Sequence, residues 1–85
     1  MLVTNSASGP PHVASVLVTV EAGRLVMRAG RKTRANIAAR SAVGLIWSGE
    51  VDREYCLIAD GTAREAPDET IAVEPTSAVL HRLAD

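Results

Sequence analysis

The sequence contains very few large side chains. Aromatic residues make up 2% of the 85 residues, as one tryptophan, one tyrosine and no phenylalanine. The 47% that is hydrophobic therefore consists mainly of alanine, valine, leucine and isoleucine, which each bury little apolar area. A chain of this length buries only about two thirds of its unfolded surface. The composition argues against a roomy monomeric enzyme and favours a small sheet domain that completes its core against a second copy of itself.

Other absences exclude further classes of protein. Cys56 is the single cysteine, which excludes an internal disulfide and a cysteine-based zinc site, and a lone thiol fits a reducing cytoplasm. His12 and His81 lack the spacing of metal ligands, so we expect no metal site. No run of about 18 apolar residues occurs, so we expect no membrane span. The start of the chain also lacks the features of a signal peptide.

Charge is unevenly distributed although the net charge is only −1. Residues 22–49 carry six basic residues and no acid, whereas residues 50–85 carry nine acids and three arginines. Three interpretations remain open: a solvated face, an anion site in the middle of the chain, and association of the acidic part with a neighbour's basic centre. Binding of nucleic acid is disfavoured, because the pI is near 6.1 and no aromatic residues interleave the basic patch.

The pattern of β-branched residues, turn residues and alanines predicts six short strands and one helix. Gly23 predicts a tight hairpin loop, Asp60-Gly61 a bulge, and Pro75 a kink. Gly30 and Thr33 are the candidate residues at the helix start. The tail 77–83 fits a strand or a short helix, and a strand is favoured. We expect strands over 2–7, 12–20, 25–28, 42–48, 55–65 and 70–74, a helix over 32–40 and a polar loop over 48–54.

These elements predict a mainly β fold. Six short antiparallel strands in so short a chain close most economically into a barrel, which also removes exposed sheet edges. The expected architecture is a six-stranded antiparallel split β-barrel with one short helix after the third strand. It would span residues 1–85 as a single domain.

No catalytic constellation stands out, and the best candidate site is the junction that leads into the helix. A helix N-terminus presents free N–H groups and a partial positive charge. Arg31, Lys32 and the hydroxyl of Thr33 would add a cradle for a phosphate. The alternative is an ordinary basic helix start on the surface.

Five segments, taken in order, resemble the pyridoxamine 5′-phosphate oxidase-like split-barrel flavoproteins. That family binds FMN, or in some branches a deazaflavin or haem, and is typically a homodimer with cofactor sites at the subunit interface. The segments are Gly9-Pro10-Pro11-His12-Val13, the hairpin Glu21 to Leu25, Arg31-Lys32-Thr33-Arg34-Ala35-Asn36-Ile37, Ala42-Val43-Gly44-Leu45-Ile46-Trp47, and Gly61-Thr62-Ala63.

The resemblance implies a flavin- or deazaflavin-dependent oxidoreductase that works as a cytoplasmic homodimer, without nucleic acid or membrane partners. FMN is the first expectation, a deazaflavin the second, and haem the third. Residues of the junction would hold the phosphate, and two others would border the ring or the dimer interface. The implied set is Arg28, Arg31, Lys32, Thr33 and Asn36 for the phosphate, with Ser15 and Trp47 beside the ring or interface.

The sequence departs from the family pattern at three places. Thr33 stands where the family usually has a phosphate-binding lysine, the leading helix of the family is missing, and the turn over 65–70 lacks a helix that many relatives insert. The resemblance therefore implies a short form of the family. The alternative is a non-catalytic homodimeric split-barrel protein that binds no redox cofactor.

Overall fold

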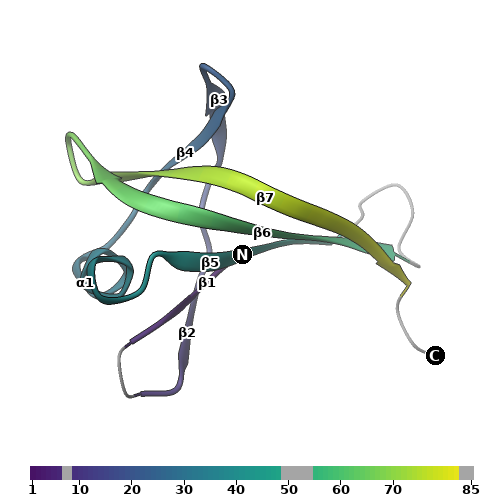
Figure 1. Ribbon diagram of the computed structural model, residues 1–85, viewed down its shortest axis with the longest axis horizontal. Helices are drawn as coiled ribbons and strands as arrows, with labels where there is room; N and C mark the ends of the chain where they lie inside the picture. Colours follow the sequence, from purple (N-terminus) through teal and green to yellow (C-terminus); the bar gives the residue numbers. More distant parts are fainter. Residues whose placement is uncertain (7–8, 49–54, 83–85) are drawn as a thin grey trace.

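A computed structural model describes residues 1–6, 9–48 and 55–82 (Figure 1). In this part of the chain, seven strands form one antiparallel sheet in the order β2-β1-β5-β6-β7-β4-β3, with a single helix between β4 and β5. The predicted mainly β fold with one short helix is confirmed. The elements are β1 (Leu2–Asn5), β2 (Pro11–Ala14), β3 (Thr19–Glu21), β4 (Arg24–Arg28), α1 (Arg31–Ala39), β5 (Ala42–Ser48), β6 (Tyr55–Ala66) and β7 (Thr70–Arg82).

The predicted strand over 12–20 is in fact two strands. β2 pairs with β1 at one edge of the sheet, and β3 pairs with β4 at the opposite edge. Residues 15–18 cross between the two edges outside any strand. The prediction of six strands in a closed barrel is therefore wrong. The sheet has seven strands and is open, because no ladder among the described residues joins β2 to β3.

The crossing segment explains why sequence pattern alone gives a single strand. Val16 and Val18 pack against the core, whereas Leu17 between them is 92% exposed. Inward and outward side chains thus alternate through residues 15–18 as they would in a strand. Alternation of polar and apolar residues in the sequence indicates which side chains face the core. It does not indicate whether the backbone of the segment is hydrogen bonded to a neighbouring strand.

The predicted hairpin between β3 and β4 is confirmed. Glu21 pairs with Arg24 across a loop of two residues, Ala22 and Gly23, whose φ angles are 50° and 77°. Two positive φ angles are typical of type I′ turns, whose twist matches that of the flanking strands.

The hairpin of β6 and β7 forms the longest ladder of the described sheet, and it contains the predicted bulge. The register shifts between Asp60 and Gly61. Thr76 Oγ1 donates to the Asp60 carbonyl at 3.1 Å, and Ser77 Oγ donates to Asp60 Oδ2 at 3.3 Å. Strand β7 continues past Pro75 to Arg82, so the favoured strand in the tail is confirmed over 77–82. The loop predicted after residue 48 lies outside the described residues.

Small aliphatic side chains form the core on one face of the sheet. Leu2, Leu45, Ile71 and Val73 are among its fully buried members, and Ile37 of α1 packs onto the same cluster. Trp47 packs against the margin of this cluster and is only partly buried. The arrangement agrees with the expectation that the core must be built without aromatic residues.

Gly61 allows β6 and β7 to approach closely at the bulge. A Cβ atom there would lie 2.7 Å from Val73 Cγ1 and 2.8 Å from the Glu74 carbonyl oxygen. We expect Gly61→Ala to lower the free energy of unfolding by about 1–3 kcal/mol in urea denaturation, because neither neighbour is a flexible side-chain tip.

Gly44→Ala is the matched control for this prediction. A Cβ atom at Gly44 would meet Val3 Cβ at 3.9 Å, an ordinary contact. Its loss should stay below about 1 kcal/mol. Equal losses in the two variants would contradict the account of the bulge.

Candidate anion-binding site

The predicted phosphate site is the short junction between β4 and α1. Strand β4 ends at Arg28, and α1 begins at Arg31 after the extended N-cap residue Gly30. No side chain caps the helix, and its first turn contains no acid. Arg31 and Lys32 are exposed. The junction therefore combines unsatisfied helix N–H groups, the positive end of the helix dipole and two accessible cations, an arrangement that attracts an anion.

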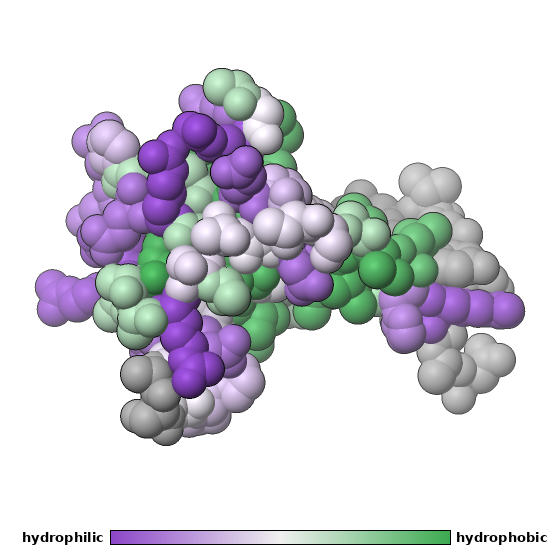
Figure 2. Space-filling view, in the orientation of Figure 1, coloured by the Kyte–Doolittle hydropathy of each residue, from purple (hydrophilic) through white to green (hydrophobic). Residues whose placement is uncertain are grey.

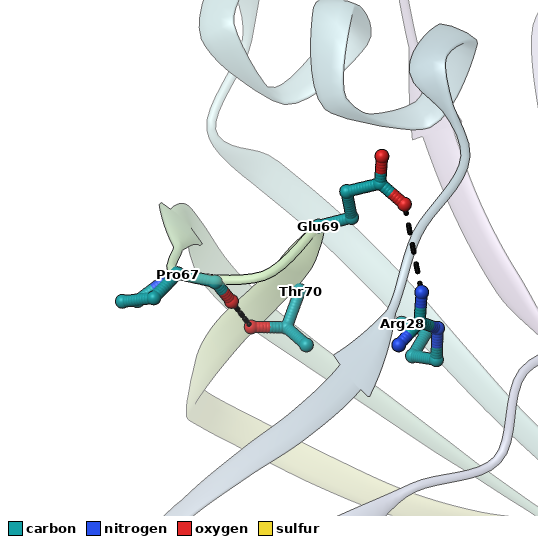
Figure 3. Close-up of polar contacts among 4 residues, drawn as sticks. All are labelled: Arg28, Pro67, Glu69 and Thr70. Atoms are coloured by element: carbon teal, nitrogen blue, oxygen red, sulfur yellow. Dashed lines mark hydrogen bonds and ion pairs between the residues drawn. The ribbon is translucent and has the colours of Figure 1, made fainter.

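The turn between β6 and β7 reaches this junction (Figure 3). Arg28 Nη2 lies 3.5 Å from Glu69 Oε2, and the N–H of Ala29 donates to the Glu69 carbonyl at 3.0 Å. The two ion-paired side chains are 77% and 65% exposed, so the pair contributes at most about 1 kcal/mol to stability. A competing anion can therefore displace the carboxylate from Arg28 at a small cost.

The backbone of the turn holds Glu69 in place. Asp68 and Glu69 both have positive φ angles, 62° and 60°, although neither is glycine. Thr70 Oγ1 donates to the Pro67 carbonyl at 2.6 Å and closes the turn (Figure 3). Residues with a Cβ adopt this region at a cost of roughly 1 kcal/mol or more each. The turn is thus fixed against the junction by backbone contacts, while the Glu69 side chain remains exposed.

A shallow groove lies beside the junction on the outer face of the sheet. Its floor comes from alternate residues that pair across strands, such as Val26 with Thr19 and Arg28 with Thr70. Its volume is about 330 Å³, near the lower end of the roughly 300–1,000 Å³ range of ligand sites. The lining residues are Leu17, Thr19, Glu21, Val26, Met27, Arg28 and Thr70.

Arg28 connects the groove to the junction. It lines the groove and lies three residues before Arg31. Leu17 also lines the groove, where its highly exposed side chain offers an apolar contact surface. The groove thus offers an apolar contact at Leu17, a cation at Arg28 and a carboxylate at Glu21.

Two of the predicted phosphate ligands face the interior of the protein. Thr33 and Asn36 are 3% and 5% exposed. Asn36 Nδ2 donates to Thr4 Oγ1 at 3.1 Å, which anchors α1 to β1. Of the two candidates for the helix start, Gly30 is the N-cap residue, whereas Thr33 lies inside the helix and does not cap it with its side chain. A direct role for Thr33 or Asn36 at a cofactor stays a prediction; their positions assign them to packing.

Ser15 and Trp47 are not brought to Arg28. Ser15 is exposed in the crossing segment, two residues before Leu17. Trp47 lies on β5 and packs against the core, on the face of the sheet opposite the groove. Neither residue lines the groove.

Sequence reasoning missed Glu69 and Leu17. The charge pattern gave only a partial signal for Glu69, because the open interpretation was association of the acidic part with a neighbour's basic centre and not a contact within one chain. In the structure, one such contact forms within the chain, between Glu69 and Arg28. Leu17 also had a signal, because alternation places this leucine on the same face as the polar residues Ser15 and Thr19.

Among residues 1–6, 9–48 and 55–82, no group of three or more histidine, cysteine, aspartate or glutamate side chains lies together in a way that could hold a metal ion. The helix described in that part of the chain is too short to cross a membrane. Cys56 is a buried free thiol.

Comparison with known proteins finds two mycobacterial relatives. The chain is 42% identical over 59 residues to the uncharacterized protein Mb0449c of Mycobacterium bovis, and equally to the uncharacterized protein MT0457 of Mycobacterium tuberculosis. Each match covers 62% of this chain and 42% of the relative, so the chain spans less than half the length of these curated relatives. No family model matches the chain. No solved structure matches it either.

The buried hydrogen bond between Thr4 and Asn36 holds α1, the helix that follows the junction, against β1. Asn36→Ala removes the donor and leaves the Thr4 hydroxyl buried without it. We expect this variant to lower the free energy of unfolding by about 1–3 kcal/mol. Thr4→Val should also destabilise the protein, and the double variant should lose less than the sum of the single losses. Strictly additive losses in chemical denaturation would show that the two side chains are not coupled.

Proposed function

We propose that this chain binds a phosphate-bearing redox cofactor, with the phosphate at the junction of β4 and α1 and the ring in the adjoining groove. FMN is the first candidate, a deazaflavin coenzyme the second and haem the third. The activity would be that of a flavin- or deazaflavin-dependent oxidoreductase. The observation that carries the proposal is that Arg28 lines the groove and lies two residues before the N-cap of α1, a helix with no side-chain cap and no acid in its first turn.

The side chains of the junction fit a phosphate. Arg28, Arg31 and Lys32 supply exposed charged donors, and charge-assisted hydrogen bonds are the strong ones. Arg34, one turn into the helix, has a buried Nε with no hydrogen-bond partner. An unsatisfied buried donor is itself a reason to expect a missing acceptor.

The residues of the chain would bind and orient the cofactor. Thr33 and Asn36 act indirectly: both are buried, and the hydrogen bond from Asn36 to Thr4 holds α1 against β1. Leu17 offers an apolar contact to one face of a flat ring. When bound, a flavin supplies the redox chemistry itself, and the protein contributes position and electrostatics.

The resemblance to the pyridoxamine 5′-phosphate oxidase-like flavoproteins supports this proposal, and it adds a homodimer. A reducing cytoplasm is the proposed location, because the buried free thiol of Cys56 needs no oxidising compartment. We infer neither a nucleic-acid partner nor a membrane partner.

A second candidate function is a non-catalytic homodimeric protein that binds no redox cofactor. The burial of Thr33 and Asn36 favours it, since two positions of the expected phosphate site are occupied by internal packing. A thermal-shift panel with FMN, a deazaflavin and haem separates the two functions. Stabilisation by one of them supports the first, and no shift with any of them supports the second.

The Arg31→Ala/Lys32→Ala variant tests the position of the phosphate. Hydrogen bonds to charged groups contribute roughly 1.5–3 kcal/mol each, so loss of the two cations should weaken FMN binding at least about tenfold. Flavin fluorescence quenching measures the affinity. Arg64→Ala is the matched control, because Arg64 is also an exposed arginine but lines neither the junction nor the groove. Unchanged affinity in the double variant would place the phosphate elsewhere.

Glu69→Gln tests whether the turn of β6 and β7 competes for Arg28. The substitution removes the negative charge and keeps the shape of the side chain. We expect FMN or inorganic phosphate to bind about two- to fivefold more tightly, since an exposed ion pair contributes up to about 1 kcal/mol. The gain should shrink at high salt, which screens exposed charges. Weaker binding in this variant would show that Glu69 helps the ligand instead of competing with it.

A further inference from the structure

The groove beside the junction carries opposite charges at its two ends. Arg28 lines the end where β4 leads to the junction, and Glu21, the last residue of β3, also lines the groove. Glu21 pairs in the ladder with Arg24, which lies four residues before Arg28 on β4. Because an antiparallel strand rises about 3.4 Å per residue, the backbones of Glu21 and Arg28 lie roughly 14 Å apart along the strands. The groove therefore has a cation at one end and a carboxylate at the other.

The carboxylate of Glu21 is not used by the arginine across the ladder. Opposite charges directly across an antiparallel pair attract each other. In the described part of the chain, however, no ion pair joins Glu21 to Arg24. Arg24 lines a separate cavity of about 90 Å³ together with Glu74, whereas Glu21 lines the groove. The two side chains thus border different cavities, and the carboxylate of Glu21 is available to a ligand in the groove.

A hydroxyl group lies on the same wall of the groove as this carboxylate. Thr19 precedes Glu21 by two residues on β3, so strand alternation places both side chains on one face, and both line the groove. A carboxylate accepts hydrogen bonds, whereas a hydroxyl group can donate one. Together the two side chains match a ligand edge on which an N–H group lies beside a carbonyl group.

We propose that Glu21 recognises the imide edge of a flavin or deazaflavin ring and accepts a hydrogen bond from its N–H group. This edge carries an N–H between two carbonyls in both kinds of ring, and a hydrogen bond to a carboxylate is charge-assisted. The rim of haem carries two carboxylates and no N–H donor, so the negative charge of Glu21 disfavours haem. The inference rests on the proposed function, and it narrows the cofactor to a flavin or a deazaflavin.

An FMN analogue methylated at the imide nitrogen tests this contact without any change to the protein. The methyl group removes the N–H donor and leaves the phosphate in place. We expect the wild-type chain to bind the analogue about three- to tenfold more weakly than FMN in fluorescence titrations, because one hydrogen bond is lost. In Glu21→Ala the two ligands should bind within about twofold of each other, because the carboxylate that distinguishes them is absent.

Two further variants define what Glu21 contributes. Glu21→Gln should lose less affinity for FMN than Glu21→Ala, since the amide oxygen can still accept the hydrogen bond. Glu74→Ala is the matched control, because Glu74 is also an exposed acid but lines the cavity of Arg24 and not the groove. It should leave the affinity for FMN unchanged, and a loss equal to that of Glu21→Ala would overturn the specific contact. Thermal unfolding without ligand checks that all three variants keep the fold.

The outcomes separate this inference from the cofactor proposal. Equal affinity of the wild-type chain for FMN and for the methylated analogue would overturn the role of Glu21 and leave cofactor binding intact. A preference for FMN that persists in Glu21→Ala would also overturn it, because another residue would then contact the N–H group. Binding of neither ligand would overturn the cofactor proposal and this inference with it.

Discussion

The pairing of β6 with β7 is the interaction on which the rest of the structure depends. β6 carries β5 on its other side, and through it β1 and β2, while β7 carries β4 and β3. The ladder therefore joins the two halves of the sheet. Its close approach at the bulge requires Gly61, where even a methyl group would meet Val73 and the Glu74 backbone.

The two ends of this hairpin serve different purposes. At the turn, Glu69 hydrogen bonds through its carbonyl to Ala29 and pairs through its carboxylate with Arg28, so the hairpin positions the start of α1. At the other end, β6 and β7 extend together past the end of β4, and Leu57, Val79 and Leu80 are exposed there. Figure 2 shows hydrophobic surface on this part of the hairpin. A core built from small aliphatic residues leaves such surfaces uncovered, because each side chain buries little area. The small core and the proposed dimer thus have one physical cause.

Local chemistry made much of the fold predictable. The Ala22-Gly23 loop, the bulge at Asp60-Gly61 and the helix after Gly30 follow from turn and helix preferences that act over a few residues. The division of the strand over 12–20 was not predictable, because alternation continues through residues 15–18 although the pairing partner changes. The openness of the sheet has the same origin, since it depends on contacts between residues distant in sequence.

The candidate site was predictable in its charge but not in its details. The six basic residues without an acid in residues 22–49 predict an anion site at the junction, and the absence of a side-chain cap on α1 is consistent with this prediction. The burial of Thr33 and Asn36 depends on which face of α1 packs against the sheet. The contact of Glu69 with Arg28 joins residues that are 41 positions apart in the sequence. Neither can be derived from spacing along the chain.

The central claim is that the junction recognises a phosphate, and a paired titration with FMN and riboflavin tests it most directly. The two ligands share the ring and differ in the phosphate. The account predicts that FMN binds at least about tenfold more tightly than riboflavin, since the charge-assisted hydrogen bonds of the junction act only on FMN. Equal affinity for the two ligands, or binding of neither, would contradict it.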